Sequence, residues 1–298
     1  MPYTKNLVIF SLFSFLLTIS ISTGYAVTLA DYKLAVSQKQ KILVRGISMG
    51  DGKDLDAFLY KPAGEGPFPA LVALHGAGGI FPYQLWWAKE ISKWGYVVLF
   101  VDHYCSRGHL CEPATHTEED RGEIMRNWQM VSLRQRVIDA AAAHISLSNK
   151  SYVKKDSIGL IGWSWGGASA LIAQKITKVK AITNGGFKAT IAFYPNLKYF
   201  IDNPQWIRSG PLTQPTLILY GESDILESSD SYQKLLSSGD PAAIKVVGFD
   251  GAYKKFDELG PYRERHHPRV GIFFKGFQKN AFNQSIVEIK NFLTENLR

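Results

Sequence analysis

Several features that would place this chain in other protein classes are scarce or missing. Only two of its 298 residues are cysteines, which leaves a cysteine-based metal site short of ligands. No segment beyond the N-terminal 26 residues is apolar for long enough to span a bilayer. The formal net charge is +8, but the basic residues are scattered and no nucleic-acid-binding motif accompanies them. The sequence therefore predicts no metal site, no nucleic-acid partner and no internal membrane span.

The single long apolar run lies at the N-terminus. Residues 7–21 follow a short segment whose one charged side chain is Lys5, and Gly24-Tyr25-Ala26 supplies small residues at the two positions that a signal peptidase reads. We expect a signal peptide over residues 1–26 and a mature protein over residues 27–298, exported to the periplasm or secreted. An uncleaved membrane anchor is the alternative, although the run is short and contains Ser and Thr.

The two cysteines, Cys105 and Cys111, are close together in one expected loop. An even number of cysteines at short spacing favours a disulfide in an exported protein. We therefore predict that Cys105 and Cys111 are bonded, which would stiffen this loop locally.

Apolar runs alternate with segments of helical spacing along the rest of the chain. A hairpin is expected over residues 41–48 and 55–60, whereas residues 27–40 show no strong pattern and are expected to be a surface lead-in. Buried strands are expected at residues 70–74, 96–101, 158–161, 189–194, 215–220 and 244–249, and helices at residues 87–94, 128–145, 167–176 and 282–293. This alternation predicts one α/β domain, whose mainly parallel sheet is covered by helices on both faces.

The strongest motif is Gly162-Trp163-Ser164-Trp165-Gly166. It fits the G-x-S-x-G pattern of a nucleophile elbow, and it stands between an expected strand and an expected helix, as that turn requires. A serine on such a turn points its hydroxyl out above the sheet, and the glycines allow the backbone to approach closely. The alternative is an ordinary strand–helix joint with an idle serine. We identify Ser164 as the candidate nucleophile.

Two further turns follow expected strands. His75-Gly76-Ala77-Gly78-Gly79 brings backbone amides to the carboxyl edge of the sheet, where ligands bind in this fold class; it is not a phosphate loop, because no Gly-Lys-Ser/Thr follows. Asp224 ends a Gly-Glu-Ser-Asp turn and is the candidate acid, since the expected order is serine, acid, histidine. Asp224 could instead cap its turn, and Glu222 and Asp230 are weaker rivals.

These motifs together resemble the dienelactone hydrolase family of α/β-hydrolases. The likeness covers most of the mature chain, including Leu74-His75-Gly76, Asp102 with Arg107-Gly108, the elbow, Tyr220-Gly221-Glu222-Ser223-Asp224, and residues 251–257 before the last helix. It implies the α/β-hydrolase fold and a small serine-type hydrolase of esters or lactones that needs no cofactor. By the same likeness, the amides of Trp165 and Ala77 would form the oxyanion hole.

One position departs from the family pattern. The family block reads Gly-Ala-Tyr-His, whereas here the histidine position holds Lys254. First, His266 or His267 could supply the base from the loop before the last helix. Second, Lys254 could be the base, which requires lowering its pKa from ~10.4 by about 3 units. Third, the triad could be broken and the fold kept for binding. The other histidines, at 75, 103, 109, 116 and 144, come too early in the chain for the expected order.

The sequence thus predicts a hydrolase that acts through an acyl-enzyme at Ser164 on a small ester or lactone, with a displaced or atypical base. A catalytically silent binding protein is the alternative. An aromatic group suggests an apolar acyl pocket, although core packing would explain many of these rings: Phe81, Tyr83, Trp86, Trp87, Trp163 and Trp165.

Overall fold

The structure is a computed structural model, and it describes residues 25–109, 131–197, 201, 210–226, 229–237, 240, 242–267 and 271–298. The predicted signal sequence up to residue 24 and Cys111 lie outside these residues. Cys105 is in a disulfide, but its predicted pairing with Cys111 stays a prediction. Across the described residues, no helix combines the length and apolarity that crossing a bilayer demands.

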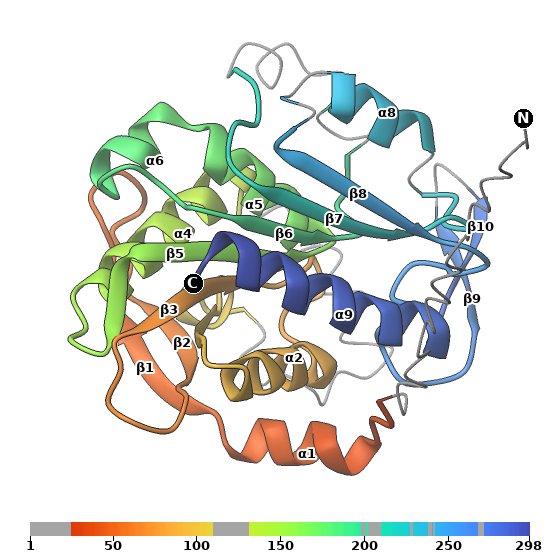
Figure 1. Cartoon of the computed structure of the whole chain (residues 1–298), viewed down its shortest axis with the longest axis horizontal. Helices are drawn as coiled ribbons and strands as arrows, with labels where there is room; N and C mark the ends of the chain where they lie inside the picture. Colours follow the sequence, from red (N-terminus) through yellow and green to blue (C-terminus); the bar gives the residue numbers. More distant parts are fainter. Residues whose placement is uncertain are drawn as a thin grey trace, which may run out of the picture.

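An eight-stranded sheet forms the centre of the fold, in the order β1-β2-β4-β3-β5-β6-β7-β8 (Figure 1). Strand β2 is antiparallel to both β1 and β4, and the other neighbours are parallel. The strands are β1 (Gln40–Val44), β2 (Leu55–Tyr60), β3 (Phe68–Leu74), β4 (Val97–Val101), β5 (Val153–Trp163), β6 (Thr190–Phe193), β7 (Thr216–Gly221) and β8 (Ile244–Phe249). The mainly parallel sheet and the antiparallel hairpin at its edge confirm the predicted fold class.

Helices cover both faces of this sheet. On one face lie α2 (Pro82–Lys93) and α9 (Lys279–Asn296), with α1 (Leu29–Ser37) beside α2; on the other lie α4 (Leu133–Ser148) and α5 (Trp165–Lys175) (Figure 1). Two short helices, α6 (Thr177–Ile182) and α8 (Ser229–Ser237), and the single turn η1 (Cys105–Arg107) complete the set found in the described residues.

Each face of the sheet has its own apolar core because successive residues of a strand point to opposite faces. Leu71, Ala73 and Phe100 contribute to the core under α2 and α9. Val72 and Leu99 contribute to the core under α4 and α5. Strand β4 is buried throughout and β3 is buried from its second residue on, which explains why they read as continuous apolar runs.

Several elements were not predicted, including the short helices α6 and α8. Helix α1 replaces the expected surface lead-in; it begins at a capping box between Thr28 and Asp31 but buries only Tyr32 and Ala35, so its apolar periodicity is weak. A two-stranded ribbon, β9 (Arg263–His267) and β10 (Gly271–Lys275), follows the family block. Strand β9 escaped prediction because its residues are basic or acidic and show no apolar alternation.

Candidate active site

Ser164 occupies a strained turn between β5 and α5. Its backbone has φ 53° and ψ −115°, a left-handed conformation that is unfavourable for a residue with a Cβ. The flanking glycines are required by space: a side chain on Gly162 would collide with the backbone of Gly166, and one on Gly166 would collide with the carbonyl of Leu74. The local geometry is therefore that of the nucleophile elbow predicted from the sequence.

The glycine-rich turn after β3 lies against this elbow. A Cβ placed on Gly76 would stand 3.5 Å from Cβ of Ser164 and 3.3 Å from the carbonyl oxygen of Trp163. The buried His75 ring donates from Nδ1 to the Gly76 carbonyl at 2.7 Å, and its Nε2 accepts the amide of His103 at 3.1 Å. His75 thus shapes its own turn, and this turn brings Ala77, half-buried, to the same edge of the sheet as the start of α5 at Trp165.

The Ser164 hydroxyl donates a hydrogen bond to Oδ1 of Asn196 at 2.8 Å. Asn196 lies just after β6, and its own amide points to the Ser164 carbonyl at 3.4 Å. A carboxamide oxygen orients a hydroxyl but cannot accept its proton at ordinary pH. Sequence reasoning missed Asn196, because only the tertiary fold places the end of β6 beside the elbow.

Asp224, the predicted acid, follows β7 and is 4% exposed. Its Oδ1 accepts the amide of Leu226 at 3.0 Å, in the manner of a turn-capping aspartate. Its Oδ2 is buried and has no hydrogen-bond partner among the described residues. Burial raises the pKa of Asp224, and the nearby Lys254 ammonium partly opposes that rise. Among the described residues, one of the two carboxylate oxygens therefore has a hydrogen-bond donor and the other has none.

Lys254 brings its ammonium group to this acid. Nζ lies 3.9 Å from Oδ2 of Asp224 and donates to the carbonyl of Tyr194 at 3.5 Å. The loop that carries Lys254 is fixed against the acid's turn, because the amide of Ser223 donates to the carbonyl of Ala252 at 2.9 Å. Lys254, which is predicted to occupy the position of the family's histidine, thus lies directly beside the predicted acid.

The backbones of His266 and His267 lie in β9, where they pair with Ile272 and Gly271 of β10. The ribbon adjoins the site through a parallel bridge between Lys275 and Lys254. Whether either imidazole can reach Ser164 stays a prediction. Asp230, a weaker rival acid, lies in the first turn of α8, and His144 is buried on α4 against the ring of Phe187.

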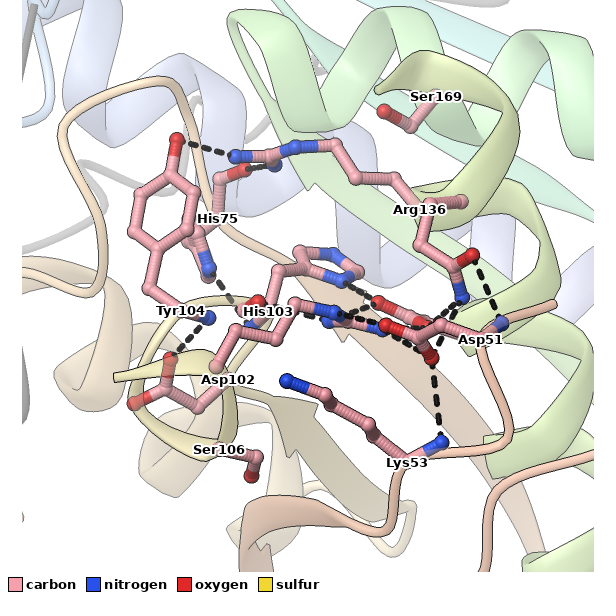
Figure 2. Close-up of polar contacts among 12 residues, drawn as sticks. Asp51, Lys53, His75, Asp102, His103, Tyr104, Ser106, Arg136 and Ser169 are labelled. Atoms are coloured by element: carbon pink, nitrogen blue, oxygen red, sulfur yellow. Dashed lines mark hydrogen bonds and ion pairs between the residues drawn. The ribbon is translucent and has the colours of Figure 1, made fainter. Parts of the chain in front are cut away.

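A second polar cluster contains His103, Tyr104 and Arg136 and contacts His75 at the start of the glycine-rich turn (Figure 2). His103 is buried and pairs with Asp139 of α4, with 2.7 Å between Nδ1 and Oδ2. Arg107 donates to both oxygens of Asp139 at 2.9 Å. Arg136 donates to the carbonyl of His75 at 2.8 Å and to the hydroxyl of Tyr104 at 2.7 Å. This cluster joins α4 to the loops at the carboxyl edge of the sheet.

The aromatic group is mostly core rather than an open pocket. The Trp163 ring is fully buried and stacks between Phe100 and Phe193, with ring centroids at 5.7 and 5.3 Å. Trp87 is also fully buried, whereas Phe81 is half-buried. The positions of these rings therefore do not support the suggested apolar acyl pocket.

The fold agrees with the comparisons to known proteins. The sequence model of the dienelactone hydrolase family matches residues 55–294, and the chain belongs to this family. A Methylorubrum extorquens protein named "putative carboxymethylenebutenolidase" is 25% identical over 215 residues, which are 69% of each chain. A Bradyrhizobium protein named "probable 2-oxo-3-(5-oxofuran-2-ylidene)propanoate lactonase" is 24% identical over 156 residues, 50% of this chain and 54% of that protein.

Solved structures share the same fold. A metagenomic dienelactone hydrolase-like promiscuous phosphotriesterase superposes with a TM-score of 0.64 at 16% identity, covering 86% of this chain and 98% of that one. Esterase 2 of Thermogutta terrifontis with propionate bound gives a TM-score of 0.59 at 17% identity, covering 87% and 95%. The chain is therefore a member of a hydrolase family with the fold that its relatives have.

Proposed function

We propose that this protein is a serine-type hydrolase of small esters or lactones and that Ser164 forms an acyl-enzyme. The Ser164 hydroxyl attacks the carbonyl carbon, and the amides of Ala77 and Trp165 donate hydrogen bonds to the oxyanion that develops. The alkoxide leaves with a proton, and water then releases the acyl group. No step requires a cofactor.

The backbone strain at Ser164 is the observation that carries this proposal. A serine at φ 53° is unfavourable, and such strain persists where the surrounding structure imposes it for a reason. Neither core packing nor an ordinary helix start needs this conformation. The exposure of an activated hydroxyl above the sheet does need it.

This site differs from a standard triad in the group that acts as the general base. We propose Lys254 as the atypical base, because its Nζ is 3.9 Å from Asp224, where the histidine of the family would stand. Proton transfer from Ser164 requires a neutral amine, and the neutral fraction of a lysine rises with pH. We therefore expect slow hydrolysis that accelerates at alkaline pH.

A silent binding protein is the second candidate function. The ammonium–carboxylate pair of Lys254 and Asp224 favours it, as does the bond from the Ser164 hydroxyl to Asn196. With Lys254 protonated, neither Lys254 nor Asn196 can accept the serine proton. The pocket would then bind an ester-like or lactone-like molecule without turning it over.

Hydrolysis of p-nitrophenyl acetate by the purified protein separates the two candidates. Ser164→Ala, Lys254→Ala, His266→Ala and His267→Ala are measured beside the wild type, from pH 6 to 10. We expect wild-type activity that disappears with Ser164→Ala and falls with Lys254→Ala. A loss with one histidine variant would identify that histidine as the base. If the wild type hydrolyses the ester no faster than Ser164→Ala does, the proposed hydrolase function is refuted and the binding function is left.

Export is a further part of the proposal. A signal sequence over residues 1–26 predicts a mature chain that begins at Val27, in the periplasm or outside the cell. Intact-mass measurement of the protein recovered from each cell fraction tests it. A full-length mass in the soluble cytoplasmic fraction would contradict export.

A further inference from the structure

One buried carboxylate has no part in the reaction proposed above. Asp257 is 0% exposed, three residues after Lys254 in the loop that follows β8. Its Oδ2 accepts the indole N–H groups of Trp87 at 3.1 Å and Trp163 at 3.0 Å. Its Oδ1 accepts the hydroxyl of Tyr194 at 2.6 Å. Three donors from three separate parts of the chain therefore converge on one side chain.

Two of these donors belong to segments that hold reactive groups. Trp163 directly precedes Ser164 at the end of β5. Tyr194 stands two residues before Asn196, the hydrogen-bond partner of the Ser164 hydroxyl, and its carbonyl accepts from Lys254. Asp257 is thus joined by side-chain bonds to the nucleophile's segment and to the segment that orients its hydroxyl, and by a short stretch of chain to Lys254.

The surroundings of Asp257 destabilise an ionised carboxylate. The side chains that bond it are neutral, and among the described residues Tyr83, Tyr32 and Glu258 are further titratable groups that interact with it. Burial raises the pKa of Asp257 to about 6, although the bonds from Tyr194 and Trp163 oppose that rise. Burying a charge without an opposite charge is unfavourable. A simple packing role would therefore be filled better by an apolar residue.

Backbone strain marks the same junction. Tyr194 has φ 34°, a conformation that a residue with a side chain adopts only when its surroundings hold it there. Its amide donates to the carbonyl of Leu219 at 2.6 Å, and its hydroxyl is held by Asp257. Strained residues thus stand at the ends of β5 and β6, and the Asp257 carboxylate binds a side chain at each end.

We propose that Asp257 is a positioning residue that fixes the Ser164 elbow, the Tyr194–Asn196 segment and the Lys254 loop relative to one another. Its effect on turnover rests on the proposed hydrolase function, whereas its effect on geometry does not. An amide at this position offers one acceptor oxygen and an NH2 group that faces donors, so it cannot bind all three. Asp257→Asn is therefore expected to loosen these three segments without altering the volume of the core.

Amide hydrogen exchange of the full chain tests the proposal without relying on activity. In Asp257→Asn, exchange at residues 163–165, 194–196 and 253–255 is expected to rise about tenfold or more, as for lost bonds to a charged acceptor. Asp102→Asn is the matched control. Asp102 is also a buried carboxylate whose pKa is raised to about 6 by burial, but its donors are the amides of its own loop, Tyr104 and Cys105. The three segments should be unchanged in that control.

Single-donor variants keep the test decisive if Asp257→Asn fails to fold. Trp163→Phe retains a stacked ring and should affect residues 163–165, whereas Tyr194→Phe should affect 194–196 and 253–255. Unchanged exchange, or an equal rise throughout the molecule, would overturn the proposal. With p-nitrophenyl acetate, Asp257→Asn should lower kcat while KM stays within about twofold. If the wild type does not hydrolyse the ester, the proposed function is refuted, but the exchange result still tests the positioning role of Asp257.

Discussion

Two buried aspartates near the carboxyl edge of the sheet have opposite surroundings. Asp139 is 3% exposed and accepts bonds from His103, Arg107 and Gln135. Burial alone would raise the pKa of Asp139, but His103 and Arg107 lower it. Asp224 is 4% exposed, keeps one oxygen without a hydrogen bond, and has a raised pKa. The chain thus contains a tight Asp–His pair, but away from the nucleophile, and a loose Asp–Lys pair beside it.

The difference separates a structural role from a functional one. A carboxylate whose bonds are all made by neighbouring side chains holds parts of the fold together and has nothing left to offer a substrate. A buried carboxylate with an open oxygen costs stability and is retained where a reaction or a ligand uses it. We therefore assign Asp139 to the scaffold and Asp224 to the site, and the following predictions test that assignment.

The largest effect is expected from Asp139→Ala. This change leaves the Arg107 guanidinium and the buried His103 without their acceptor, and breaking a buried pair in this way costs about 3–5 kcal/mol. Asp224→Ala is the matched control, for which we expect a smaller loss, because Asp224 accepts one amide hydrogen bond and its Oδ2 has no hydrogen-bond partner among the described residues. Urea unfolding measures both. Equal losses would show that the two aspartates do not differ in the way proposed.

Lys254→His should bring an Asp–His pair into the site. Imidazole beside Asp224 can accept the serine proton near neutral pH, and general-base catalysis of this kind contributes about 10³-fold. We expect p-nitrophenyl acetate hydrolysis to rise by that order at pH 7, with Lys254→Gln as the control that removes the charge but supplies no base. A folded Lys254→His protein without a rate gain would show that the acid and the elbow are not aligned for a triad.

Acid should weaken the scaffold through His103. Burial lowers the pKa of His103 to about 4, with Arg136 adding to that shift. The unfolded chain then binds more protons than the native one between pH 4 and 6.5, so stability falls by up to roughly 3 kcal/mol as the pH falls through this window. Urea unfolding from pH 7 to 4 should show the loss in the wild type and a smaller one in His103→Gln.

Asp224 should change the stability with pH in the opposite direction from His103. Its folded-state pKa is raised, so the native state binds more protons than the unfolded chain above pH 3.8, and acidification favours folding. Asp224→Asn should therefore lose more stability on acidification than the wild type does. A smaller loss in this variant would mean that the Asp224 pKa is not raised.

The smallest effect concerns the strain at Ser164. Ser164→Gly and Ser164→Ala both remove the hydroxyl, so their difference isolates the backbone, and we expect the glycine variant to be more stable by about 1 kcal/mol. Ser169, within α5, is the matched control: there alanine should be the more stable by about 1 kcal/mol. Thermal unfolding of the four variants measures the contrast. The same preference at both positions would argue against strain at the elbow.

Much of this fold could be predicted because its signals are local. Apolar runs located the central strands, and the glycines around Ser164 predicted a sharp turn at the correct residue. Helix α1 was missed because it buries only two side chains. The ribbon β9–β10 was missed because the charged residues of β9 show no alternation of apolar and polar side chains. The His103–Asp139 pair joins residues 36 positions apart, and no spacing rule connects a loop after one strand to a helix face.

The sequence by itself determined the family and the fold class, and it predicted Ser164 as the nucleophile and Lys254 at the position of the family's histidine, since each follows from a short segment whose residue types restrict its backbone or its chemistry. Only the tertiary structure decided which side chains meet. It brought Asn196 to the Ser164 hydroxyl, Lys254 to Asp224, and three distant donors to Asp257. These contacts depend on where separate strands end along one sheet edge, and that arrangement is a property of the whole packed chain.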